Sequence, residues 1–170
     1  SKDTQSDYVG ALCTRVKSLT NGIYGSVLCA EDALSDAEMF DQNVIVDLSR
    51  VGSMETKSLL MGILVMKLQE YGMNSRLRHV TVLEEAHNLL RKTSAEQSQE
   101  GANLQGKSVE MLANAIAEMR TYGEGFIIAD QAPGLLDMSV IRNTNTKIIL
   151  RLPDEEDRKL VGKSAALKEA

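Results

Sequence analysis

The sequence has few cysteines and little net charge, and each absence excludes a class of protein. Cys13 and Cys29 are its only cysteines, and neither stands in a CxxC pair or among histidines, so we expect no metal site from them. We interpret both as buried thiols of a cytoplasmic protein. The net charge of -5 provides no basic surface for a phosphate backbone. Composition therefore does not predict DNA binding.

The sequence also lacks a long apolar run. The stretch from Leu59 to Met66 lies between Lys57 and Lys67 and is far shorter than the roughly 20 apolar residues that cross a bilayer. No basic region followed by an apolar run stands at the N-terminus, so we expect neither a secretory signal nor a membrane partner. The chain begins as though cut from a longer protein. Its 170 residues, 43% hydrophobic and 25% charged, predict a single soluble domain over residues 1–170.

Short β-branched segments alternate with helical periodicity along the chain. Strands are predicted at 43–48, 79–83, 126–129 and 147–152, and helices at 54–71, 109–122 and 135–141. Residues 91–106 are polar and aperiodic, which predicts a flexible loop, and residues 153–170 begin as a capped helix. Strands this apolar, separated by helices, predict an α/β fold with a parallel sheet flanked by helices.

Polar residues follow three of the predicted strands, at Asp47, at Glu84 and Glu85, and at Asp130 and Gln131. Ligands bind beyond the carboxyl ends of parallel strands, so we expect these residues to share one edge. Of two adjacent carboxylates, one can join the shell of a Mg²⁺ ion while the other accepts a proton from water. The alternative is that both acids only stabilise the start of the next helix through its dipole.

Three segments resemble the HerA/FtsK-like branch of the P-loop ATPases. Residues 80–90 (VTVLEEAHNLL), 118–125 (EMRTYGEG) and 128–133 (IADQAP) look like the Walker B strand, the arginine-finger helix and the glutamine sensor, in the family's order. The likeness covers roughly residues 43–152. It implies a partial RecA-like sheet, the C-terminal portion of an ATPase core without its phosphate-loop strand.

The resemblance also implies roles for individual residues. Glu84 matches the acid on the Mg²⁺ side, Glu85 the catalytic base, and Gln131 a sensor of the bound ATP. Arg120 matches a finger that serves a neighbouring subunit, since a guanidinium stabilises charge on a transferring phosphate. Without the resemblance, the favoured interpretation of Arg120 is a solvated cation at a helix end, and we interpret His87 as a histidine on a helix face.

The cofactors implied are ATP and Mg²⁺, and the partners implied for the parent protein are further copies in a hexameric ring and DNA, which it would translocate. Two alternatives stay open. One is a type IV secretion or conjugation ATPase, which uses similar motifs. The other is a non-catalytic interaction module, if the chain acts alone.

Residues 101–108 (GANLQGKS) match the phosphate-loop pattern G-x-x-x-x-G-K-[ST]. A working phosphate loop leaves a buried strand and opens a helix, but no strand precedes Gly101, and the match follows the acidic pair instead of preceding it. We therefore interpret it as a chance match and expect the genuine loop upstream. The strand at 147–152 would then lack a neighbour, which residues 23–29 or a second chain could replace. A small P-loop kinase is disfavoured for the same reasons.

Overall fold

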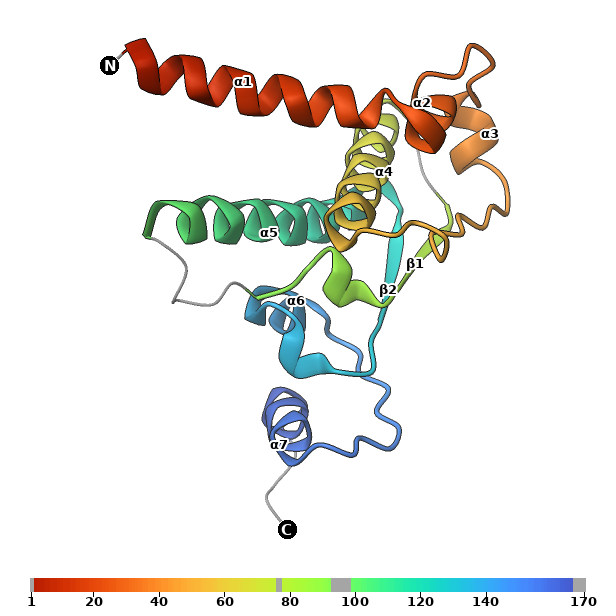
Figure 1. Ribbon diagram of the computed structural model, residues 1–170. Helices are drawn as coiled ribbons and strands as arrows, with labels where there is room; N and C mark the ends of the chain where they lie inside the picture. Colours follow the sequence, from red (N-terminus) through yellow and green to blue (C-terminus); the bar gives the residue numbers. More distant parts are fainter. Residues whose placement is uncertain (1, 76–77, 93–98, 167–170) are drawn as a thin grey trace. The chain divides into compact units, whose positions relative to one another are not determined.

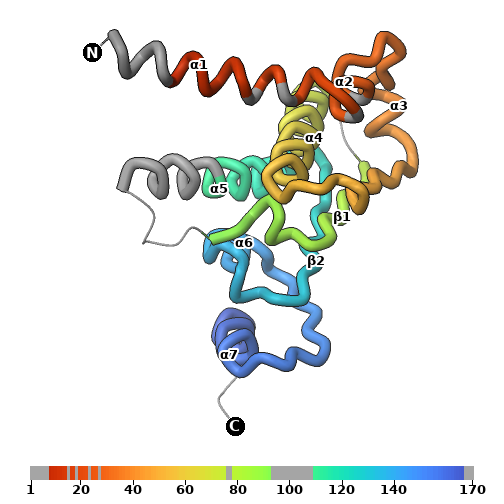
Figure 2. The backbone as a smooth tube through the Cα atoms, viewed as in Figure 1, coloured from red at the N-terminus to blue at the C-terminus, as the bar shows by residue number. Residues whose placement is uncertain are grey.

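The computed structural model describes the backbone of residues 2–75, 78–92 and 99–166 (Figure 1). Side chains are described within these ranges except for the residues drawn in grey in Figure 2. Backbone contacts group the chain into two compact units, Ser1–Met39 and Phe40–Ala170. The predicted single domain thus contains two units, and the candidate site belongs entirely to the second.

The first unit is helical. It contains α1 (Lys2–Leu19), α2 (Gly22–Leu28) and most of α3 (Asp36–Phe40), and none of its described side chains is buried. Cys13 and Cys29 are both exposed, so the prediction of buried thiols is wrong, because no described core exists here to bury them. The suggestion that residues 23–29 complete the sheet is also wrong, since Gly22–Leu28 is a helix.

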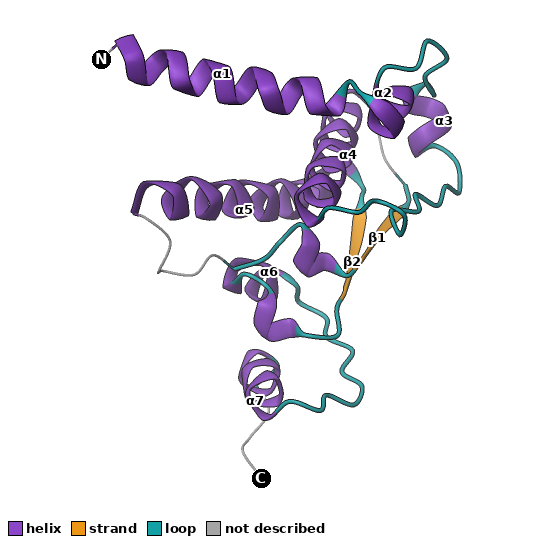
Figure 3. Ribbon diagram, in the orientation of Figure 1, coloured by secondary structure: helices purple, strands orange, loops and turns teal. Residues whose placement is uncertain are grey.

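The second unit carries the remaining elements (Figure 3). In chain order they are α4 (Met54–Asn74), β1 (Val80–Glu84), η1 (Ala86–Asn88), α5 (Gln99–Met119), η2 (Arg120–Tyr122), β2 (Gly125–Ala129), η3 (Pro133–Leu135), α6 (Met138–Asn143) and α7 (Glu155–Ser164). The helix α4 begins at its capping residue Ser53, whose hydroxyl accepts a hydrogen bond from the backbone N–H of Thr56. After η2 the chain reverses at Gly123, whose φ of 96° favours glycine.

The helix α5 begins ten positions before the predicted start at Val109. Residues 99–106, predicted as part of a loop, therefore lie in a helix, while 93–98 lie outside the described residues. The first turns of α5 carry few apolar side chains, so periodicity could not reveal them. Once the apolar face beyond Val109 forms a helix, adding turns at its N-terminal end requires no new nucleation.

The sheet is small and parallel. Within the described ranges β1 pairs only with β2, in a register that runs from Val80 opposite Gly125 to Glu84 opposite Ala129. The α/β class is confirmed in this coarse sense. The predicted strands at 43–48 and 147–152 do not join the sheet, and Ile45 and Ile148 are 94% and 88% exposed. A β-branched run favours an extended backbone, but it becomes a strand only beside a partner edge.

The core of the second unit lies where α4 and α5 meet the sheet and the turns that follow it. Its most buried apolar side chains are Val65, Leu68, Leu83, Ala86, Leu89, Leu90, Ala113, Ala115, Met119, Leu136, Val140 and Ile141. Two backbone bonds tie the turn after β1 to the turn after β2. The N–H of Asp137 donates to the carbonyl of Leu90 at 2.9 Å, and the N–H of Lys92 donates to that of Leu135 at 2.9 Å. Both turns are therefore held against one core.

Among the described helices, none combines the length and the hydropathy that crossing a membrane requires.

Candidate functional site

The candidate site begins where β1 and β2 end. Because the register stops with Glu84 opposite Ala129, Glu85 and Asp130 leave the sheet side by side. Glu85 has a left-handed backbone, with φ 51° and ψ 47°, which costs an L-residue roughly 1–2 kcal/mol. Two bonds to its carbonyl oxygen hold it there, from the backbone N–H of Asn88 at 2.9 Å and from the Asn88 side chain at 3.0 Å. Backbone strain of this kind is concentrated at functional sites.

The structure brings together two of the predicted residues, Glu85 and Gln131. The side-chain amide of Gln131 donates to Oε1 of Glu85 at 3.2 Å, across the two strand ends. The Glu85 side chain is 49% exposed, so its carboxylate is open to solvent and to a ligand. This pairing matches the expectation that polar groups following neighbouring parallel strands share one edge.

Glu84 ends β1 and is exposed, whereas the preceding Leu83 is buried. Since successive side chains of a strand point to opposite faces, Glu84 is turned away from the core. Its carboxylate has no hydrogen bond to the part of the chain that the structure describes. It is therefore available to a ligand from outside.

The sequence did not predict that His87 contacts both Asp130 and Glu85. Its backbone N–H donates to Oδ2 of Asp130 at 2.8 Å, its ring Nδ1 lies 2.9 Å from the same oxygen, and its Nε2 lies 3.7 Å from Oε2 of Glu85. The ring is only 17% exposed, and His87 lies in the 3-10 turn η1, so it is a helical residue whose ring faces the strand ends. His87 is directed back toward the end of β2 because η1 is a single 3-10 turn.

Arg120 lies elsewhere. It is exposed in η2, before the first residue of β2, while Gln131 lies beyond the last. The five residues of β2 separate the two by roughly 15 Å at the usual rise of a strand. Arg120 therefore cannot reach Glu85 in its own chain.

Asp47 belongs to the extended segment that does not join the sheet. Its carboxylate accepts a bond from the backbone N–H of Ser49 at 2.8 Å, and this bond lowers the pKa of Asp47 from its ordinary value. The expectation that Asp47 shares the edge with Glu85 depended on a strand at 43–48, and no contact in the described residues supports it.

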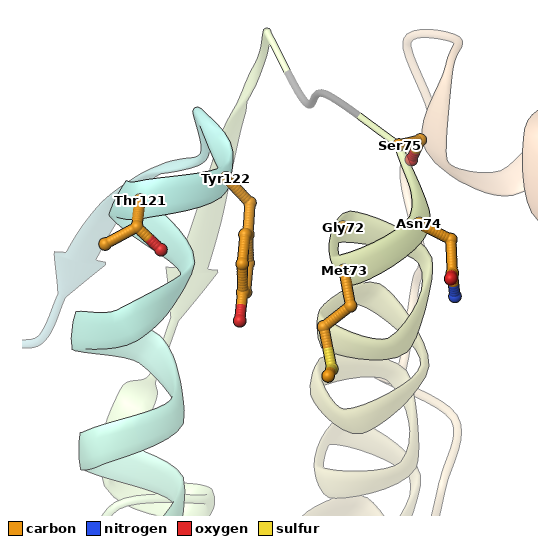
Figure 4. A pocket seen from close by; sticks show the side chains of 6 residues that line it. All are labelled: Gly72, Met73, Asn74, Ser75, Thr121 and Tyr122. Carbon is orange, nitrogen blue, oxygen red and sulfur yellow. The ribbon is translucent and has the colours of Figure 1, made fainter.

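The opposite end of the sheet carries a buried polar cluster and a shallow hollow. The carboxylate of Glu124 is fully buried, accepts a bond from the Thr81 hydroxyl at 2.6 Å and lies 2.7 Å from Nδ1 of His79. Nearby, the hollow in Figure 4 lies between the end of α4 and η2 and is lined by Gly72, Met73, Asn74, Ser75, Thr121 and Tyr122. Both features lie at the amino ends of the strands, away from Glu85, and the cluster fixes β1 to the segment that leads into β2.

The residues at the carboxyl edge can be tested against Mg²⁺ and a triphosphate. Among the described residues, no group of three or more histidine, cysteine or acidic side chains is arranged to hold a metal ion. Mg²⁺ bound with a nucleotide usually uses only one or two carboxylates, together with phosphates and waters. The open carboxylates of Glu84 and Glu85 fit that mode of binding.

The match to a phosphate loop does not supply the phosphate site. The backbone of residues 101–108 lies inside α5, where most N–H groups bond to carbonyls one turn earlier instead of converging on an anion. The interpretation as a chance match agrees with this helical backbone.

No protein-family model matches the sequence, and no curated protein matches it significantly. The likeness to HerA/FtsK-like ATPases therefore depends on the three motifs and on how their residues are arranged.

Proposed function

We propose that this chain carries the hydrolytic edge of a HerA/FtsK-like ATPase core, which couples Mg²⁺-dependent ATP hydrolysis to the translocation of DNA. The observation that carries the proposal is the 3.2 Å bond between Gln131 and Glu85 at the ends of adjacent parallel strands. A carboxylate and an amide held together in this way suit the positioning of water beside a phosphate. DNA as the translocated polymer comes from the family likeness.

In this proposal each residue has one task. Glu85 accepts a proton from the attacking water, since its carboxylate is half exposed and fixed on one side by Gln131. Gln131 orients that water or contacts the γ-phosphate with its remaining amide hydrogen. Glu84 holds the hydrated Mg²⁺ through water. Bound Mg²⁺ and ATP would supply the electrophilic phosphorus and neutralise charge on its oxygens.

Two further groups must come from outside this edge. Arg120 lies at the other end of β2, so we propose that it serves the site of a neighbouring copy in a ring. The phosphate-binding loop is supplied by a segment other than the described residues of this chain. The same outside segment would supply the missing strand of a RecA-like sheet, beside which the extended segments 43–48 and 147–152 would find partners.

The test is phosphate release at millimolar Mg²⁺-ATP, with and without double-stranded DNA, by the parent protein that carries both this chain and the phosphate-binding loop. Loss of a general base slows a reaction by about 100-fold or more, so Glu85→Gln should reduce the rate by at least that factor and Gln131→Ala by about tenfold. Glu110→Gln, an exposed acid on α5, is the control and should leave the rate unchanged. A rate that is independent of Glu85 and Gln131 would refute the proposal.

The role of Arg120 can be tested by mixing. Arg120→Ala and Glu85→Gln should each be inactive alone, but an equimolar mixture should regain part of the activity, because one interface in the mixed assembly carries both native groups. No recovery at any protein concentration would exclude a finger that acts between copies.

A second candidate, a non-catalytic interaction module, is favoured by the apolar side chains left exposed in the second unit. They include Ile45, Val82, Ile127, Ile148 and Leu150, each more than half exposed, and exposed apolar surface often marks a contact with another protein. If no variant of Glu85 changes phosphate release while Ile148→Lys abolishes self-association, this second function is the correct one.

A further inference from the structure

Asp130 is a buried acid that the proposed chemistry does not use. Its side chain is 3% exposed, and a carboxylate so far from water is costly unless donors surround it. Three donors are present. The backbone N–H of Ala132 binds Oδ1 at 2.8 Å, while Oδ2 receives the backbone N–H of His87 at 2.8 Å and faces its ring Nδ1 at 2.9 Å.

Two of these contacts come from one residue, which fixes His87 in both position and rotation. The backbone bond places the Cα of His87 against the end of β2, and the ring bond stops rotation about the side-chain torsions. Because an ionised carboxylate only accepts hydrogen bonds, the ring nitrogen that faces Asp130, Nδ1, must carry a hydrogen. The other nitrogen, Nε2, is then directed at Glu85, 3.7 Å from its Oε2.

The Glu85 carboxylate is thereby confined between two groups. Gln131 binds Oε1, and the His87 ring stands against Oε2. We propose that His87, locked by Asp130, is a positioning residue that keeps the Glu85 carboxylate in its working orientation. This inference rests on the proposed role of Glu85 as the base.

Stability alone does not explain the arrangement. A contact of 3.7 Å with a side chain as exposed as Glu85 contributes little to folding, and any hydrogen-bond donor at the position of Nδ1 would satisfy Asp130. The His87 ring adds a rigid group beside Oε2 of Glu85, which limits the movement of that carboxylate. A base that is held within a fraction of an ångström of its productive position gains rate, and a loosely held base loses it.

Two substitutions separate the two contacts of the ring. His87→Asn places an amide nitrogen near the position of Nδ1, so it keeps the bond to Asp130 but is too short to reach Glu85. His87→Gln places its amide nitrogen near the position of Nε2, so it can still contact Glu85. Because the chain has only two histidines, His79 and His87, the ring nitrogen resonances of His87 are assigned by a single substitution.

The first readout needs no nucleotide. In the ¹H–¹⁵N NMR spectrum of the whole chain, the side-chain amide of Gln131 reports the position of Glu85. We expect its resonances to move to free-amide values in His87→Asn and to stay close to wild type in His87→Gln. The wild-type His87 ring should show a protonated Nδ1, and Asp130→Asn should remove that preference. An unmoved Gln131 amide in folded His87→Asn would overturn the inference.

The second readout is phosphate release under the conditions given above. A positioning role predicts a roughly tenfold lower kcat in His87→Asn with little change in KM, and recovery to within about threefold of wild type in His87→Gln. Equal rates in both variants would overturn the inference. A wild-type parent protein that releases no phosphate would overturn the proposed function instead, and the Gln131 amide would still decide whether His87 positions Glu85.

Discussion

Glycine at position 85 should make the chain more stable than alanine does, which reverses the usual order. Both substitutions remove the same carboxylate and its bond to Gln131, so they differ only in the backbone. Glu85 has a φ of 51°, a conformation that glycine adopts without steric cost and alanine does not. The comparison therefore isolates the strain of the turn that aims the proposed base.

The magnitude follows from two opposing effects. The left-handed conformation costs an L-residue about 1–2 kcal/mol, and glycine removes that cost. Glycine also gives the unfolded chain more freedom, which favours alanine by about 0.4–1 kcal/mol. The free energy of unfolding should therefore be about 0.5–1 kcal/mol higher for Glu85→Gly than for Glu85→Ala, or a few degrees in Tm.

The assay is urea unfolding followed by circular dichroism, with the pair Glu110→Gly and Glu110→Ala as the control. Glu110 is exposed within α5, where alanine should be the more stable by about 1 kcal/mol. The sign of the difference should thus reverse between positions 85 and 110. Alanine being more stable at both positions would show that Glu85 is not held in the left-handed conformation.

Three further predictions concern the scaffold around the site. His79→Ala removes the ring whose Nδ1 lies 2.7 Å from the buried carboxylate of Glu124 and should lower the free energy of unfolding by about 3 kcal/mol. An unchanged midpoint in urea unfolding would contradict this. Asp137→Ala removes the N-cap of α6 and should cost about 1 kcal/mol, whereas Asp137→Asn should cost much less; equal losses would exclude the cap. The Tyr122 hydroxyl donates to Glu118 at 3.1 Å, and this bond raises the pKa of Tyr122, so the bond is lost as pH rises through that raised value. Glu118→Gln should lower the pKa of Tyr122, measured by an ultraviolet difference titration against Tyr122→Phe. An unchanged titration curve would refute the assignment.

The elements that could be predicted from the sequence are those whose local pattern and tertiary contacts agree. The helix α4 and the strands β1 and β2 have the expected periods and pack on a shared core. The segments 43–48 and 147–152 have equally strong β-branched patterns, but pattern alone cannot supply the partner strand that pairing needs. The start of α5 was missed for the opposite reason, since its polar turns have no apolar period.

The candidate site, like the fold, could be predicted only in part from the sequence. Glu85 and Gln131 come together because both directly follow parallel strands, which chain order alone indicates. His87 could not be placed, because its position depends on a left-handed glutamate and a single 3-10 turn after β1. Glutamate has no preference for that conformation, so no local rule predicts a turn that directs the ring back to Asp130.

The most direct test of the central claim replaces Mg²⁺ with paramagnetic Mn²⁺ and measures the broadening of backbone amide resonances by Mn²⁺-ATP, with Mn²⁺ alone as the control. A nucleotide-bound ion at the carboxyl edge should broaden Glu84, Glu85 and Gln131 most and leave Tyr122, at the far end of β2, sharp. Broadening centred on residues 101–108, or no difference between Mn²⁺-ATP and Mn²⁺ alone, would contradict the placement of the hydrolytic site at this edge.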